Sequence, residues 1–298
     1  MKANARRIKE RIYKYIFSAL AFASLLFLVG ITITLFVEGT PLFKEVGFFK
    51  FLGGTLWYPT HSEPEYGILS LIMGSLWVTV GAVAICVPLG VGSALFINEL
   101  ASRRTRAFLK PFIELLAGIP SIVYGFFGIV IVAPLIQDLL NLPVGLTAFS
   151  GSLILGIMAT PTVCSISEDA LNFVPREFRE ASFAVGANRW QTLTRVVIPA
   201  AASGISASII LGMSRAVGET MTVLMVTGGA AVMPKTFFQP VRPMTATIAA
   251  EMGETVMGST HYHSLFAIGL ILFLITLVFN IVAELISRRF RLKLGLGR

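Results

Sequence analysis

An arginine and a glutamate, Arg215 and Glu219, interrupt a segment that is otherwise apolar, small or hydroxylated between residues 205 and 226. A spacing of four places both side chains on one face of a helix, where they can reach one another. A charge at the centre of a bilayer costs at least about 2.5 to 3.5 kcal/mol, so an arginine there should face the protein interior. A guanidinium remains charged at cellular pH and offers planar donors that match the oxygens of an oxyanion. Arg215 is therefore the first candidate for an anion contact, and a purely structural ion pair is the alternative.

The composition around this pair is that of an integral membrane protein. Of 298 residues, 55% are hydrophobic and 13% are charged, whereas soluble domains contain about 25% charged residues. The apolar runs reach about 20 residues and do not alternate with period two, so they predict membrane-spanning helices and not barrel strands. We predict an all-α protein with six spans at residues 15–37, 68–97, 115–136, 150–166, 203–227 and 264–286.

The basic residues outside these spans predict the orientation of the chain. With a cytoplasmic N-terminus, nineteen Lys and Arg residues lie on the cytoplasmic side, and only Lys44, Lys50, Lys235 and Arg242 lie on the other. This asymmetry places both termini in the cytoplasm. It also accounts for the net charge of +8 without nucleic-acid binding, because the basic residues are dispersed between apolar runs. We divide the chain into residues 1–66, with an uncleaved first span and an outer loop, and a five-helix core at residues 67–298.

Residues that weaken helices lie within several of the predicted spans. Examples are Pro88 in the second, Gly118 and Pro120 in the third, and Pro161 in the fourth. Such residues are tolerated in membrane helices when neighbouring groups satisfy the backbone carbonyls that lose their partners. The spacing leaves two interpretations open, which are kinked but packed helices and broken helices that line a path.

The most polar internal segment is residues 167–200, which has the pattern of two helices joined by a turn. Pro175 suits the first position of a helix, and Gly186 can adopt the left-handed conformation that closes it. Asn188 can cap a second helix, which Pro199 is expected to end. The segment is either a protruding hairpin that another protein grips or a surface hairpin that packs under the bundle.

The first of these helices carries a short face made by Phe178, Ser182 and Val185, at positions i, i+4 and i+7. Such a face is expected to enter a groove on another protein. "EAS" at residues 180–182, Gly186 and "VVIP" at residues 196–199 resemble the EAA loop of bacterial ABC-importer permeases. Ser182 replaces an alanine of that pattern.

The resemblance implies a type I ABC-importer permease fold and a coupling helix seated in a cleft of a separate ATPase. The residues expected to make that contact are Glu180, Ala181, Gly186, Phe178, Arg179 and Ser182. The chain has no G-x-x-x-x-G-K-[ST] sequence, so no phosphate-binding loop is predicted. We therefore expect a subunit that is not itself an enzyme, with ATP and magnesium bound by its partner.

Three further stretches resemble the PstC type of phosphate-transport permease. They are "ELLAGIPSIVYGFFGI" at residues 114–129, "GMSRAVGETMTV" at residues 212–223 and "PMTATIAAEMGE" at residues 243–254. The resemblance implies phosphate as substrate, a bacterial or archaeal cytoplasmic membrane, and no cofactor of the chain's own. It implies as partners a PstA-like second permease, two PstB-like ATPases and a PstS-like phosphate-binding protein. A PstA-type subunit and a sulfate or molybdate permease are the alternatives within this class.

The substrate path is expected to include Arg215, Glu219, Thr220, Thr222, Ser121 and Tyr124. Glu219 would repel an anion, and two hypotheses explain it. Either it neutralises Arg215 while the path is empty, or it accepts a hydrogen bond from the P–OH of monohydrogen phosphate, which sulfate cannot donate.

Two readings outside this class, and two weaker signals, remain. A secondary transporter in which Glu219 relays protons would leave the two-helix loop without a purpose. A membrane sensor or scaffold without transport would leave the charged pair with a purely structural role. "HYH" at residues 261–263 is expected to be an interfacial cluster and not a metal site. Glu251 and Glu254, in an outer loop, either contact a binding protein or are solvated.

Overall fold

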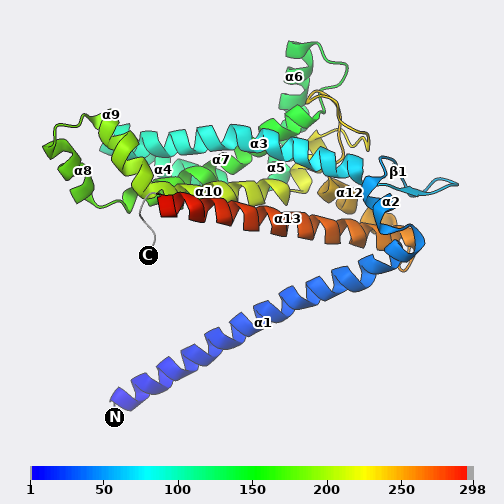
Figure 1. Cartoon of the computed structure of the whole chain (residues 1–298), viewed down its shortest axis with the longest axis horizontal. Helices are drawn as coiled ribbons and strands as arrows, with labels where there is room; N and C mark the ends of the chain where they lie inside the picture. Colours follow the sequence, from blue (N-terminus) through cyan, green and yellow to red (C-terminus); the bar gives the residue numbers. More distant parts are fainter. Residues whose placement is uncertain (1, 294–298) are drawn as a thin grey trace.

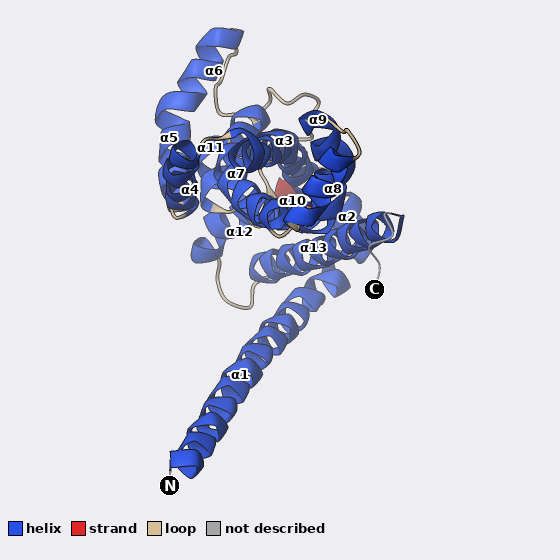
Figure 2. Ribbon diagram, turned by 90° about the vertical axis from the view of Figure 1, so that its left-hand side faces the viewer, coloured by secondary structure: helices blue, strands red, loops and turns tan. Residues whose placement is uncertain are grey.

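The computed structural model describes the backbone of residues 2–293 and the side chains of residues 11–285, Ser287 and Arg288. Most of this part of the chain is helical (Figures 1 and 2). The terminal basic residues Lys2, Arg6, Arg7, Lys9, Arg289, Arg291, Lys293 and Arg298, counted above for topology, lie outside the described side chains.

Most elements are helices joined by short connections, and the long irregular segment 227–243 joins α11 to α12. The helices are α1 (Lys2–Glu45), α2 (Phe48–Gly53), α3 (Leu69–Leu95), α4 (Arg103–Ala117), α5 (Ser121–Phe127), α6 (Ala133–Leu140), α7 (Ala148–Asn172), α8 (Arg176–Ala184), α9 (Arg189–Thr192), α10 (Ile198–Val217), α11 (Met221–Val226), α12 (Met244–Glu251) and α13 (Thr260–Lys293). Strands β1 (Trp57–Tyr58) and β2 (Glu65–Tyr66) form an antiparallel hairpin. The π-helical turns η1 (Phe96–Leu100), η2 (Gly128–Val132) and η3 (Leu193–Val197) and the 3-10 turn η4 (Met252–Glu254) continue neighbouring helices.

Six helical stretches among the described residues are long and apolar enough to cross a membrane, which confirms the predicted number. They are Arg11–Glu45, Leu69–Leu100, Ser121–Leu140, Ala148–Asn172, Arg189–Val217 and Thr260–Leu285. Several of the predicted boundaries are wrong: the first stretch extends to Glu45, the fourth extends to Asn172 and the fifth begins at Arg189. The third stretch begins at Ser121 and not at residue 115, because the helix is broken at residues 118–120, and the fifth ends at Val217 and not at residue 227.

A bundle of α3, α7, α10 and α13 forms the body of the protein (Figure 1), and Figure 2 shows α7 among its neighbours. Glycines allow the close packing of α7. A Cβ added at Gly156 would lie 2.8 Å from the Cβ of Ile85, and one added at Gly90 would lie 2.7 Å from the Cβ of Val163. Small residues at such contacts let membrane helices approach closely, which is a main source of their packing energy.

The first helix, α1, leaves the bundle at an angle (Figures 1 and 2). It contacts α13 toward its C-terminal end, where Leu42 is fully buried. At the same contact a Cβ added at Gly39 would lie 3.2 Å from the backbone of Ala267. Large apolar side chains between Ile12 and Val37 are exposed, as expected for a helix surrounded by lipid or by another subunit.

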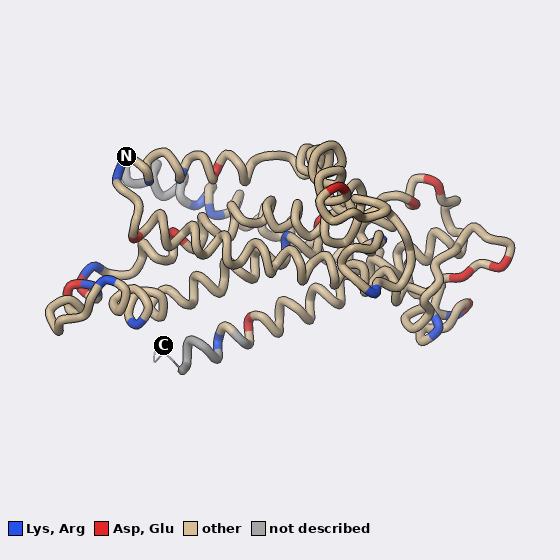
Figure 3. The backbone as a smooth tube through the Cα atoms, turned by 90° about the horizontal axis from the view of Figure 1, so that it is seen from above, with Lys and Arg blue, Asp and Glu red and all other residues tan. Residues whose placement is uncertain are grey.

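The two ends of the bundle carry most of the charge, and the long middle part carries little (Figure 3). Helices α8 and α9 lie at one end, and α2, the β-hairpin and α12 lie at the other (Figure 1). This distribution is the one expected for helices that cross an apolar layer, because charged side chains are excluded from its centre.

Pro199 does not end the second helix of the two-helix loop, so that expectation is wrong. The chain remains helical from Arg189 through η3 to Val217. A proline lacks the backbone N–H and its ring clashes with the preceding turn of an α-helix. Here Pro199 follows a π-helical turn and occupies the first turn of α10, where a proline N–H is not needed.

Candidate functional site

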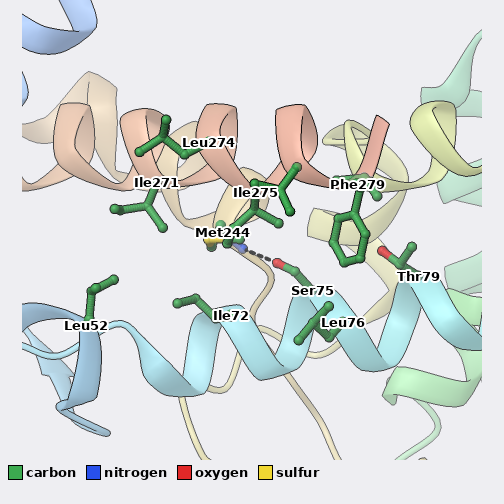
Figure 4. A pocket seen from close by; sticks show the side chains of 12 residues that line it. Leu52, Ile72, Ser75, Leu76, Thr79, Met244, Ile271, Leu274, Ile275 and Phe279 are labelled. Atoms are coloured by element: carbon green, nitrogen blue, oxygen red, sulfur yellow. Dashed lines mark hydrogen bonds between the residues drawn. The ribbon is translucent and has the colours of Figure 1, made fainter. Parts of the chain in front are cut away.

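A cavity of about 470 Å³ between α3 and α13 is lined almost entirely by apolar side chains (Figure 4). Ile72 and Leu76 of α3 face Ile271 and Ile275 of α13 across it. The hydroxyl of Ser75 lies at its wall but already accepts a hydrogen bond from the backbone N–H of Met244 at 2.9 Å. Such a cavity offers no charged group to an anion, so the candidate site for an oxyanion lies elsewhere.

That site lies where two broken helices meet. One break separates α4 from α5 at residues 118–120, and the other separates α10 from α11 at residues 218–220. The hydroxyl of Thr222, which is fully buried, donates to the backbone carbonyl of Ser121 across the two breaks at 3.0 Å. At residues 118–120 the structure therefore favours a broken helix over a packed kink, whereas Pro88 and Pro161 lie inside the continuous helices α3 and α7. Irregular backbone at membrane depth is tolerated where it is enclosed by protein or lines a cavity.

Arg215 lies in the last turn of α10, beside this junction. Its Nε is buried and has no hydrogen-bond partner among the described residues. Burying a donor without a partner costs about 1 to 3 kcal/mol, and more when the group is charged. The guanidinium is therefore the group at this junction with unused capacity to bind an anion.

Glu219 does not share a helix with Arg215, so the expectation of a helical i, i+4 pair is wrong. Helix α10 ends at Val217 with Gly218 as its C-cap, and Glu219 and Thr220 lie in the break before α11. No ion pair joins the two side chains in the described structure. The carboxylate of Glu219 instead accepts a long hydrogen bond of 3.4 Å from the backbone N–H of Thr222.

The hydroxyl groups predicted to line the path mostly satisfy backbone carbonyls. Tyr124, whose side chain is buried, donates to the carbonyl of Leu116 at 2.9 Å. The hydroxyl of Thr220 donates to the carbonyl of Gly218 at 3.4 Å. With these bonds made, the hydroxyl protons of Tyr124 and Thr222 are not free to reach an anion, whereas the long bond of Thr220 is weak.

Thr245, in the first turn of α12, is a residue of this junction that sequence reasoning missed. Its hydroxyl donates to the carbonyl of Glu219 at 2.7 Å. The segment 243–254 was expected to be an outer loop, but Met244–Glu251 is a helix whose first turn is buried. The sequence did contain a signal, since Pro243 directly before the hydroxylated "MTAT" is typical of a helix start.

Glu251, at the other end of α12, is not solvated. Its carboxylate accepts hydrogen bonds from the Trp57 indole at 3.1 Å and from Arg242 at 2.7 Å, and lies 2.9 Å from His261 Nε2. His263 Nδ1 lies 2.8 Å from the carbonyl of Glu38. The histidines of "HYH" therefore tie α13 to neighbouring elements, and Glu251 holds α12 to the β-hairpin and to the loop before it.

The turn after α8 forms as predicted. Gly186 adopts the left-handed conformation with φ of 83°. Its N–H bonds to the carbonyl of Phe183 at 3.0 Å, and the N–H of Ala187 bonds to that of Ser182 at 3.2 Å. This pair of bonds is the Schellman motif. Asn188 then caps α9 in a capping box with Gln191, which confirms its predicted role.

The predicted docking face of α8 is only partly exposed. Phe178 is half-exposed and Val185 is largely exposed. Ser182, however, is buried, and its hydroxyl lies 2.9 Å from that of Thr192 in α9. Its place in the outward face is therefore wrong, because the serine holds the two helices of the loop together. Glu180, Ala181 and Phe183 lie on the exposed surface of α8 instead.

Below this loop, α4 is fastened to α7 by an ionic cluster around Glu168. The side chain of Glu168 is only 2% exposed, and its carboxylate accepts hydrogen bonds from the Arg106 guanidinium at 2.5 Å and from the Lys110 ammonium at 2.7 Å. Lys110 also contacts Asp169 at 3.0 Å. The hydrogen bond to Glu168 is the main reason that the pKa of Lys110 is raised above its usual range. This lysine is therefore charged at any cellular pH.

The chain matches known transport proteins along most of its length. Residues 86–292 match the family described as "Binding-protein-dependent transport system inner membrane component". The chain belongs to this family. It is 38% identical over 286 residues, 95% of the chain, to the probable ABC transporter permease YqgH of Bacillus subtilis, of which 93% is covered. It is 34% identical over 98% of the chain to the phosphate permease PstC of Mesorhizobium japonicum, of which 95% is covered.

Solved structures show the same fold. The alignment with a chain of a bacterial alginate ABC transporter covers 94% of this chain and 96% of the other, with a TM-score of 0.65 and 15% identity. The alignment with the MetNI methionine ABC transporter covers 75% of this chain and 94% of the other, with a TM-score of 0.56 and 18% identity. At these identities the likeness concerns the fold alone. It confirms the predicted ABC-importer permease fold, and with the six apolar helices it makes this chain a multi-pass membrane subunit.

Proposed function

We propose that this permease translocates inorganic phosphate as one of two membrane subunits of an ATP-driven importer. The observation that carries the proposal is the unpartnered Nε of Arg215 beside the junction of two broken helices. The choice of phosphate as substrate rests on relatives named as phosphate permeases, such as that of Mesorhizobium japonicum. Alternating access, in which the path opens to one side and then to the other, is the mode of transport we infer.

The chemistry of the junction fits a phosphate ion. The guanidinium of Arg215 can take two oxygens of the anion through parallel N–H donors. Among the described residues the carboxylate of Glu219 accepts only the long bond from Thr222, so it is available to accept a hydrogen bond from monohydrogen phosphate. A site built around such a bond rejects an anion that lacks the proton, because a buried acceptor would lose its partner.

The energy source is inferred to be a separate pair of ATPases. Helix α8 protrudes at the end of the bundle (Figure 1) with Glu180 and Ala181 exposed, as a coupling helix requires. We infer two PstB-like subunits, which bind ATP and magnesium, a PstA-like second permease and a PstS-like phosphate-binding protein. The bundle end with α8 and both termini are then cytoplasmic, and the membrane is the cytoplasmic membrane of a bacterium or archaeon.

The test is transport by the reconstituted importer. Vesicles that contain this permease and the three partner types should take up phosphate when ATP is present on the ATPase side. Arsenate should compete and sulfate should not. Arg215→Gln should abolish uptake while the complex still assembles. Uptake of sulfate in preference to phosphate, or uptake by this chain alone with a proton gradient, would contradict the proposal.

A further inference from the structure

Helix α8 is joined to the bundle mainly by polar side chains. A cavity of about 380 Å³ separates it from the ends of α3 and α7, and its packing contacts are with α9 and η3. Arg179 is the residue of α8 whose side chain crosses to α7 and η1, and it lines this cavity. A movement imposed on α8 therefore reaches α10 through α9 and η3, which are continuous with it, and it reaches α7 and η1 through the backbone before α8 or through this arginine.

Arg179 makes several charge-assisted bonds across that space. Its guanidinium donates to Glu99 of η1 at 2.7 Å and to the carbonyl of Val174, at the end of α7, at 3.0 Å. A longer bond of 3.4 Å reaches Asn98. The planar fork of arginine holds these partners in fixed directions, which a lysine would not do.

The bonds continue from η1 into α7. The amide of Asn98 donates to Asn172 at 2.7 Å, and the amide of Asn172 donates to Glu168 at 2.6 Å. Arg106 of α4 donates to both Asn172 and Glu168. We call Arg179, Glu99, Asn98, Asn172, Glu168, Arg106 and Lys110 the polar network.

The polar network ends on α4, which leads directly to the helix break. Lys110 and Arg106 both lie on α4, and the carbonyl of Leu116, near its C-terminal end, accepts the hydroxyl of Tyr124 in α5. The next residues of the chain form the break that meets Thr222. A displacement of α4 is therefore passed on to the junction beside Arg215.

We propose that Glu168 is a positioning residue for transport, which makes α4 move with the coupling helix so that the ATPase stroke reaches the helix break. Its nearly complete burial supports this role. A buried ion cluster is weak evidence for stability, since apolar side chains of similar volume often stabilise a protein as well or better. Within the polar network, Glu168 is the carboxylate that joins α7 to α4 through two cations, Arg106 and Lys110. The inference rests on the proposed function.

The first test is the amount of phosphate transported per ATP by the complete importer in vesicles. Glu168→Gln keeps the shape of the side chain and removes the charge that holds α4. We expect transport per ATP to fall by about 2- to 30-fold, the range of coupling effects measured along such networks, with ATP hydrolysis continuing. Asp169→Asn is the matched control, because it lies next to Glu168 but is half-exposed and bonds only Lys110; it should retain the wild-type ratio.

The second test follows the movement itself and does not depend on the substrate. Spin labels at Glu177 and Arg104, both exposed, report the distance between the first turn of α8 and the start of α4. Both native cysteines are buried, so labelling is directed to the introduced sites. The distance should stay constant through the ATP cycle in the wild-type complex and should change with ATP in Glu168→Gln.

The outcomes separate the two proposals. If the wild-type complex takes up no phosphate, the proposed function fails, while the distance measurement still tests Glu168. A wild-type transport ratio or an unchanged distance in Glu168→Gln overturns the positioning role. If that variant does not assemble, Arg179→Lys is expected to show the same uncoupling, because the Arg179 side chain bonds Glu99 and the carbonyl of Val174 and does not lie on the exposed surface of α8. A double variant should lose no more than the worse single one, because both act in one pathway.

Discussion

The turn after α8 gives a prediction whose magnitude follows from one dihedral angle. Gly186 has a φ of 83°, and a Cβ added there would meet no atom within 4 Å. A substitution therefore adds backbone strain and no steric clash. For an L-residue with a Cβ, the left-handed conformation costs about 1 to 2 kcal/mol, and less for asparagine. A cost of this size changes the population of the ordered turn by about 5- to 30-fold.

The affinity of the permease for its ATPase partner should follow this strain. We measure binding by co-purification with the ATP-binding subunit over a range of its concentrations. Affinity should decrease from Gly186→Asn to Gly186→Ala and again to Gly186→Val. The weakening should reach about 5- to 30-fold for alanine, because the partner binds only the ordered turn. Gly186→Pro, which also removes the N–H bond to Phe183, should be at least as damaging as valine.

A second glycine provides the control. Gly92 also has open space around it but lies inside helix α3, where alanine is favoured over glycine by about 0.5 to 1 kcal/mol. Gly92→Ala should bind the ATPase as the wild type does. Equal binding by Gly186→Ala and the wild type, or weaker binding by the asparagine variant than by alanine, would refute the strain argument.

Three further predictions concern single side chains. Thr222→Val should lower the melting temperature in detergent, with a cost of about 1 to 3 kcal/mol for the unpaired carbonyl across the break, and Thr222→Ser should restore it. Glu219→Gln should admit sulfate and weaken discrimination against it in the vesicle assay; unchanged discrimination with intact phosphate uptake would exclude the proton-reading role. Glu251→Gln removes the counter-charge of Arg242 and should destabilise the protein by about 1 to 3 kcal/mol, whereas Glu254→Gln, at an exposed position, should leave the melting temperature unchanged.

Much of the fold could be predicted because its signals are local in the chain. Six apolar runs of sufficient length give six candidate spans, since a bilayer requires every backbone group to be bonded within the helix. The turn at Gly186 and the cap at Asn188 were also predictable, because their bonds join residues within five positions of one another. In each case the responsible residues lie within one or two helical turns.

The helix breaks show where such local signals end. Gly118 and Pro120 announced an irregularity in the third span, but the spacing left a kink and a break equally open. Gly218 gave no comparable warning, and an i, i+4 pattern placed Glu219 on the same helix as Arg215. The break there is held by bonds from Thr222 and Thr245, whose partners lie in other segments of the bundle.

The sequence by itself determined the membrane class, the number of spans, and the turn and cap of the two-helix loop, because these depend on composition and on near neighbours. Only the tertiary structure decided that Glu219 parts from Arg215 and that Glu168 joins α4 to α7. Glu168 lies 62 positions from Arg106 and Trp57 lies 194 positions from Glu251. No periodicity extends over such separations, so the partners of these buried charges are fixed by how the helices pack.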